Sequence, residues 1–77
     1  MTEYEWMKIF GQNLAEIMQE KGYTQLDLAN ATGLSQTAIH QYIHAKRMPT
    51  ITAITNMLYE LNEDWYDFVD FGDRIER

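Results

Sequence analysis

The sequence predicts an all-α fold of five helices, and three observations support this prediction. The chain has one proline and four glycines in 77 residues, so most of it is free to form helices. Apolar residues recur at intervals of three and four along several segments, which is the spacing of a helix that packs one face against a core. No segment shows the two-residue alternation of a half-buried strand, and even residues 51–55 keep the three-residue interval.

The first predicted helix begins after Thr2 and ends at Gly22. Thr2 and Glu5 have the spacing of a capping box, in which each side chain accepts a hydrogen bond from the backbone N–H of the other. Gly22 suits the left-handed conformation of a helix end. Gly11 lies inside this helix and costs about 1 kcal/mol relative to alanine, so we expect another element to pack closely against it. The apolar face consists of Trp6, Ile9, Phe10, Leu14, Ile17 and Met18.

Two short helices are predicted at the centre of the chain. Thr24 caps the first, from residue 25 to about residue 32, and Gly33 ends it. Ser35 caps the second, from residue 36 to about residue 44. The residues expected to face the core are Leu28, Ala29, Ile39, Tyr42 and Ile43. The outer side of the second short helix carries Gln36, Thr37, His40, Gln41 and His44, none of which is acidic.

A fourth and a fifth helix complete the predicted fold. Thr50, which follows Pro49, caps the fourth, and Asn62 tolerates the left-handed conformation expected at its end. Asp64 begins the fifth helix, whose large apolar residues exceed what one face of a short helix can bury, so we expect part of this set in a subunit interface. The apolar residues of the fourth helix are Ile51, Ile54, Met57, Leu58 and Leu61, and those of the fifth segment are Trp65, Tyr66, Phe68, Val69 and Phe71.

The composition predicts one small domain over residues 1–77. A chain of 77 residues buries only about 60% of its unfolded surface, which leaves no room for two independent cores. There is no cysteine, which excludes disulfides and cysteine-based chemistry. No apolar run approaches the roughly 18 residues that span a bilayer, and the first residues are acidic, so we expect a soluble cytoplasmic protein. No phosphate-binding loop or dinucleotide fingerprint is present, and we expect no enzymatic activity.

The charges are unevenly distributed along the chain, which has 6 basic and 12 acidic residues and a net charge of −6. Residues 23–50 carry Lys46 and Arg47 against Asp27 alone. This central third is therefore the part that an anion would approach, whereas the C-terminal third would repel one. The acidic residues of that last third are Glu60, Glu63, Asp64, Asp67, Asp70, Asp73 and Glu76.

The two histidines lie four residues apart in the same central third. His40 and His44 have the spacing of two metal ligands on one helix face, but no third ligand accompanies them at a suitable spacing, so we expect no metal and no cofactor. Their protonation would add positive charge to the polar side of the helix, and this favours a pH-sensitive contribution to anion binding.

Residues 23–50 also carry the pattern of two short helices joined by a glycine turn. The turn needs a residue with free backbone dihedrals, and the crossing of the helices needs a small side chain. The residues at these and the neighbouring positions are Gln25, Leu28, Ala29, Gly33, Leu34, Ser35 and Ile39, followed by the Lys-Arg-x-Pro sequence of residues 46–49. This pattern resembles the lambda repressor/Cro family of phage-type helix-turn-helix regulators over roughly residues 10–70.

The resemblance implies a compact five-helix domain that binds double-stranded DNA. It places the helix-turn-helix at about residues 24–44 and leaves an acidic C-terminal helix and tail at residues 62–77. The implied phosphate contacts are Gln25, Ser35, Lys46 and Arg47, and the implied base contacts in the major groove are Gln36, Thr37, His40 and Gln41, with His44 on the same surface. Thr32 and Ala45 depart from the family pattern, which usually has a large aliphatic residue and a glycine there, and the first helix lacks the usual arginines.

Two functions follow as hypotheses. The first is a sequence-specific transcription regulator of Cro/repressor type that binds a two-fold operator as a homodimer. The second is a protein-interaction module on the same fold, antitoxin-like or antirepressor-like, that uses the acidic C-terminal third to bind a basic partner. Substitutions at Gln36, Gln41 or Arg47 would weaken only the first function, and substitutions at Trp65, Phe71 or the acidic residues only the second.

Overall fold

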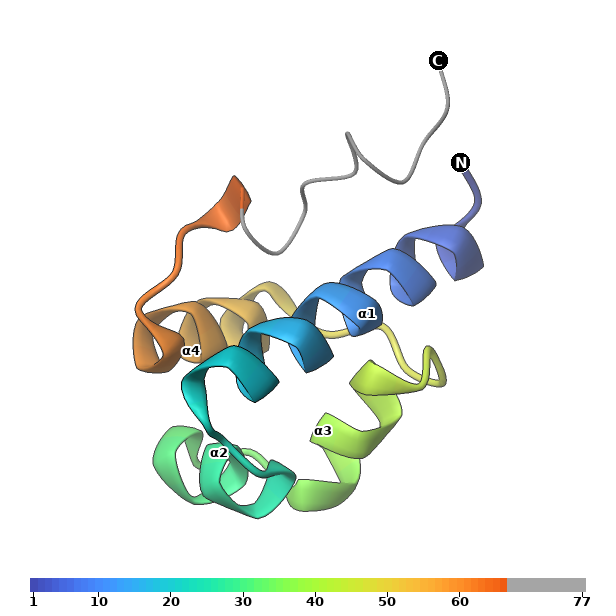
Figure 1. Cartoon of the computed structure of the whole chain (residues 1–77). Coiled ribbons are helices and arrows are strands. Elements are labelled where there is room, and N and C mark those ends of the chain that lie inside the picture. Colours follow the sequence, from blue (N-terminus) through green and yellow to red (C-terminus); the bar gives the residue numbers. More distant parts are fainter. Residues whose placement is uncertain (67–77) are drawn as a thin grey trace.

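The structure, a computed structural model, describes residues 1–66, and in this range it contains four helices (Figure 1). Helix α3 packs against α1 and α2, and α4 packs against the same two helices. The helices are α1 (Glu3–Lys21), α2 (Gln25–Thr32), α3 (Gln36–Ile43) and α4 (Ile51–Leu61). This confirms an all-α fold.

Each of the four helices begins at the polar cap that the sequence predicts. Thr2, Thr24, Ser35 and Thr50 have extended backbone dihedrals, and each side-chain oxygen accepts a hydrogen bond from the backbone N–H three residues later. In α1 the capping box is complete, because the Glu5 carboxylate also accepts a hydrogen bond from the Thr2 backbone N–H at 3.0 Å. The same hydrogen bond holds the pKa of the Glu5 carboxyl below its usual value.

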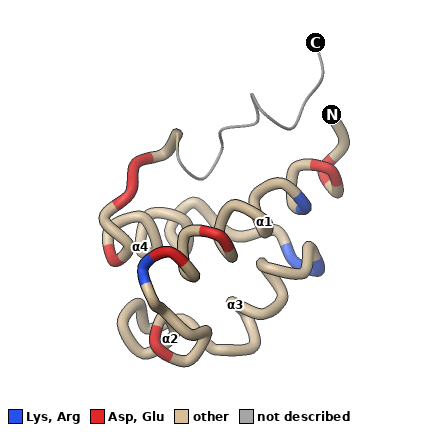
Figure 2. The backbone as a smooth tube through the Cα atoms, viewed as in Figure 1, with Lys and Arg blue, Asp and Glu red and all other residues tan. Residues whose placement is uncertain are grey.

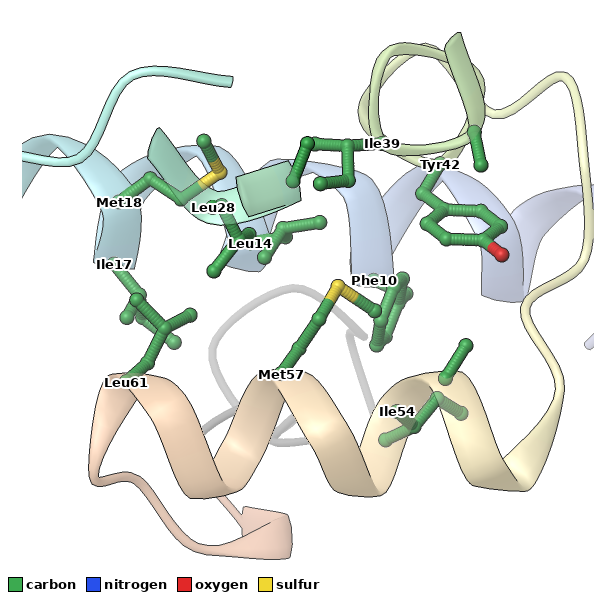
Figure 3. Packing of buried hydrophobic residues seen from close by; sticks show 13 residues of the cluster. Phe10, Leu14, Ile17, Met18, Leu28, Ile39, Tyr42, Ile54, Met57 and Leu61 are labelled. Carbon is green, nitrogen blue, oxygen red and sulfur yellow. The ribbon is translucent and has the colours of Figure 1, made fainter. Parts of the chain in front are cut away.

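The core lies where α1, α2, α3 and α4 meet (Figure 3). Figure 3 shows Ile54, Met57 and Leu61 of α4 pointing toward side chains of the other three helices. Each side chain that is buried completely contributes about 1.5–3 kcal/mol through removal of apolar surface from water. The completely buried large side chains are Phe10, Leu14, Leu28, Ile39, Met57 and Leu61.

The predicted apolar face of α4 is correct except at its first residue. Ile54, Met57 and Leu61 are buried, and Leu58 is partly buried. Ile51, however, leaves 76% of its surface exposed. It is the first residue of the helix, one turn before Ile54 and beyond the edge of the core, so the three-residue interval alone assigned it wrongly.

The described residues contain four helices rather than the predicted five. Trp65 and Tyr66 have helical backbone at the end of this range, and both side chains are exposed, at 45% and 79%. The rest of the predicted fifth helix, with Phe68, Val69 and Phe71, lies outside the described residues. Within the described range, no helix has the length and apolar character needed to cross a membrane.

Two polar contacts join the connection between α1 and α2 to the end of α4. The Tyr23 hydroxyl donates a hydrogen bond to the Glu60 carboxylate at 2.7 Å, and this bond raises the pKa of the tyrosine. The Lys21 ammonium lies 3.1 Å from the Glu63 carboxylate. Two of the C-terminal acidic residues therefore have partners within the chain, next to the start of α2.

Candidate nucleic-acid interface

Helices α2 and α3 are joined by a tight turn whose geometry depends on two residues. Gly33 has a φ of +78°, in the left-handed region that side chains disfavour. The Thr32 hydroxyl donates to the carbonyl of Leu28 at 2.7 Å and accepts from the backbone N–H of Leu34 at 3.2 Å. The Thr32 hydroxyl therefore links a carbonyl of α2 to the backbone N–H that follows the turn, a role that an aliphatic side chain cannot fill.

The start of α2 lies at the surface beside this turn. Gln25 is its first residue and is half-buried. Asp27 closes a capping box with Thr24, because its carboxylate accepts from the Thr24 backbone N–H at 2.9 Å, and this bond lowers the pKa of the carboxyl. The glutamine is thus held at a helix N-terminus, where backbone N–H groups and the helix dipole favour an anion.

Helix α3 divides cleanly into a buried face and an exposed face. Ala38, Ile39 and Tyr42 are buried in the core, and Ser35 caps the helix by accepting from the Ala38 backbone N–H at 3.0 Å. The side chains on the opposite face are Gln36, Thr37, His40 and His44, all exposed, with Gln41 half-buried at its edge. The structure therefore brings every predicted base-reading side chain to one surface.

The two histidines contact each other on this surface. The rings of His40 and His44 have centroids 4.3 Å apart and are tilted by 47°. In the described range no group of three potential metal-binding side chains occurs. The exposed face of α3 and its end therefore carry two neighbouring imidazole rings.

The end of α3 fixes the position of the two cationic residues. Ala45 has a φ of +57°, its backbone N–H donates to the carbonyl of Tyr42 at 3.3 Å, and the Lys46 N–H donates to the carbonyl of Gln41 at 2.8 Å. These two bonds form a Schellman motif, which turns the chain sharply away from the helix axis. Lys46 and Arg47 follow directly and are exposed, so they lie at the C-terminal end of the exposed α3 face.

The charges around α3 favour an anion over a cation. Figure 2 shows α3 without a charged residue and the cationic loop of Lys46 and Arg47 beyond its end. From residue 28 to residue 50 these two are the charged residues. The acidic residues Glu60 and Glu63 lie against Tyr23 and Lys21 instead. Helix α3 and the turns on either side of it therefore carry no acidic residue.

The hydrogen bonds of Thr32 and the contact of Tyr23 with Glu60 were not predicted from the sequence. The hydrogen bonds of Thr32 were missed, although its hydroxyl was the signal that pointed to them. The contact of Tyr23 with Glu60 was missed because 37 residues separate the two and no local pattern links them.

Two predictions are confirmed. Asn62 has the predicted left-handed backbone, with a φ of +54°, and Gly11 packs closely against another element, the last residues of α3.

The comparisons with known proteins agree with this geometry. A family model described as helix-turn-helix matches residues 14–64, which is more than half of the chain and includes all of α2, α3 and α4. No curated protein matches the chain.

Proposed function

The chain belongs to the lambda repressor/Cro-like helix-turn-helix family of DNA-binding transcription regulators, and from this membership we propose that it is a sequence-specific regulator of Cro/repressor type. In the proposal α3 enters the major groove of double-stranded DNA. The observation that carries it is the exposed face of α3, which has hydrogen-bonding side chains, no acidic group, and a pair of cations at its end.

Gln36, Thr37, His40 and Gln41 are the proposed base contacts, with His44 beside them. A glutamine amide pairs bidentately with the N6 and N7 atoms of adenine, and a threonine offers a methyl contact to thymine or a hydroxyl hydrogen bond. Direct reading of a base requires the side chain to be accessible, and these are all exposed or, for Gln41, half-exposed. The proposed bases therefore include A·T pairs at the positions that the glutamines contact.

The proposed phosphate contacts lie at the two ends of this surface. Gln25 and Ser35 stand at helix starts, where their side chains and the backbone N–H groups can donate to a phosphate or position it. Lys46 and Arg47 bind phosphates from the loop after α3. Phosphate contacts set the register of the protein on the duplex but carry no sequence information, so these four residues affect affinity and the α3 residues affect specificity.

A homodimer is part of the proposal. A two-fold dimer places one α3 in each of two successive major grooves and matches a palindromic operator. Exposed aromatic residues near the end of the described range support such an interface: Tyr59 is 88% exposed, Tyr66 79% and Trp65 45%. Regulation then follows from occupancy of the operator, which excludes polymerase or a second regulator from the same site.

The test is a selection of bound duplexes from a random pool, carried out with the full chain at two salt concentrations. A regulator of this type enriches one motif with two-fold symmetry, and the enrichment persists at the higher salt because base contacts do not depend on counterion release. Enrichment of no motif at either salt concentration contradicts the proposal. It would leave the interaction module as the function to test, through variants at Trp65 and Phe71.

A further inference from the structure

Gly11 lies where α1 crosses the last turn of α3. A methyl group added at this buried glycine would lie 2.5 Å from the carbonyl oxygen of Ile43 and 2.6 Å from that of Tyr42. Carbon and oxygen atoms that are not bonded do not approach this closely, and both carbonyls belong to the backbone, so neither can rotate away. A side chain at this position is accommodated only if α1 and the C-terminal end of α3 move apart.

The N-terminal end of α3 is held by a different part of the molecule. There the chain passes from α2 through the left-handed Gly33 and the Ser35 cap, and the hydrogen bonds of Thr32 close the turn. Helix α3 therefore has two supports, the turn at its start and α1 at its end. A change at Gly11 displaces the end of α3 more than its start.

We propose that Gly11 is a positioning residue for DNA recognition, which sets the placement of the C-terminal end of α3 and with it the position of Gln41. The inference rests on the proposed function of α3. Hydrogen bonds weaken steeply when their angles and distances change, so the displacement that relieves the contact at Gly11 weakens a bidentate base contact of Gln41. Gln36 and Thr37 lie at the supported start of the helix and keep their contacts.

The test compares Gly11→Ala with the unaltered chain on duplexes that carry every base at each position of the selected motif. Gln36→Ala and Gln41→Ala first identify the position that each glutamine reads. In Gly11→Ala we expect discrimination to fall about tenfold at the Gln41 position, the order of one good base contact, and to stay unchanged at the Gln36 position. The double variant Gly11→Ala, Gln41→Ala should discriminate no worse there than Gln41→Ala alone, because both changes remove the same contact.

Two control variants separate positioning from general effects on α1. Gln12→Ala changes the neighbouring exposed residue, and Ile17→Val removes one buried methyl group from the same helix. Both should leave discrimination unchanged at every position, measured where each variant is fully folded. If Ile17→Val relaxes the Gln41 position as Gly11→Ala does, the effect comes from lost stability and the inference is wrong.

The remaining outcomes are also decisive. Equal loss at all positions, or no loss at the Gln41 position, overturns the inference while the proposed function stands. If Gly11→Ala does not fold, the test uses the double variant Gly11→Ala, Ala45→Gly, with Ala45→Gly alone as its reference. Ala45→Gly is chosen because it replaces an alanine that has a left-handed backbone. Failure to fold in that background as well assigns Gly11 to folding only and overturns the inference. Enrichment of no motif by the unaltered chain removes the proposed function itself and the inference with it.

Discussion

Gln41 is half-buried at the edge of the exposed α3 face, whereas Lys46 and Arg47 are exposed in the loop beyond it. This difference in position predicts different effects on binding. Gln41→Ala should relax the base preference at one operator position by about 1–3 kcal/mol, because it removes a contact to one base edge. Lys46→Ala and Arg47→Ala should weaken binding to all sequences alike. Titration of the operator and of a random duplex measures both effects, and equal losses on the two duplexes for Gln41→Ala would contradict its role.

Ala45 has the left-handed backbone that glycine adopts without strain. For an L-residue this conformation costs about 1–2 kcal/mol. Glycine has more conformational entropy in the unfolded chain, which lowers the free energy of unfolding by about 0.5–1 kcal/mol. We expect Ala45→Gly to raise the free energy of unfolding by about 0.5–1 kcal/mol, as measured by urea denaturation. Ala31→Gly is the matched control, since this exposed alanine lies inside α2. It should lower stability by about 1 kcal/mol. A loss of stability in Ala45→Gly would show that its buried methyl group outweighs the strain.

Among the helices, α2 has a start that is stabilised by the ionised form of Asp27. Its carboxylate accepts from the Thr24 backbone N–H, and the pKa of the carboxyl is lowered as a result. A carboxyl whose pKa is lower in the folded state adds stability above its unfolded pKa of about 3.9, and this contribution is lost as the pH falls through the folded value. Glu5 in α1 has a lowered pKa from the same kind of bond, so both caps weaken in acid.

Asp27→Asn tests this acid dependence because it keeps an oxygen acceptor for Thr24 and removes the titration. The free energy of unfolding should be higher in the unaltered chain at pH 7, and the difference should shrink as the pH falls below about 4. Urea denaturation across this pH range provides the measurement. Glu20→Gln, which changes an exposed carboxylate outside the caps, should leave the pH dependence nearly unchanged. A difference for Asp27→Asn that stays constant down to pH 3 would contradict the prediction.

The helix starts and ends could be predicted because their signals are local in the sequence. A cap and its partner lie three residues apart, and a left-handed end needs only a glycine or an asparagine, so the bounds of α1 and α2 and the φ of Asn62 followed from the chain itself. The close packing at Gly11 was predicted too, but not that its partners are the carbonyls of Tyr42 and Ile43. That identity depends on how two helices cross.

The exposed face of α3 was predicted for the same reason, since a helical period separates its polar residues from Ile39 and Tyr42. The pairing of Tyr23 with Glu60 and of Lys21 with Glu63 was not predictable, because no local pattern in the sequence links these residues. These contacts join elements that are far apart along the chain. They show that Glu60 and Glu63 of the acidic C-terminal third contact residues just before α2.

In the whole molecule, which has 6 basic residues and a net charge of −6, the number of cations that contact phosphate sets the salt dependence of DNA binding. The exposed cations next to α3 are Lys46 and Arg47, so a dimer neutralises about four phosphates, and each contributes about −0.9 to the slope of log K against log salt concentration. We expect a slope of roughly −3.6, which is shallow for a DNA-binding protein. Arg47→Ala should reduce its magnitude by about 1.8, one phosphate per subunit.

Fluorescence anisotropy titrations between about 50 and 200 mM salt measure this slope on the selected operator. Lys8→Ala is the matched control, because Lys8 lies on α1 with its ammonium over the ring of Tyr4, 5.7 Å from the ring centroid, and the slope should not change. A slope steeper than roughly −6 would mean that cations outside the α3 surface also contact phosphates. A cation that binds a phosphate releases a counterion from the DNA, and this release contributes to the slope. An unchanged slope in Arg47→Ala would therefore mean that the duplex does not contact the end of α3.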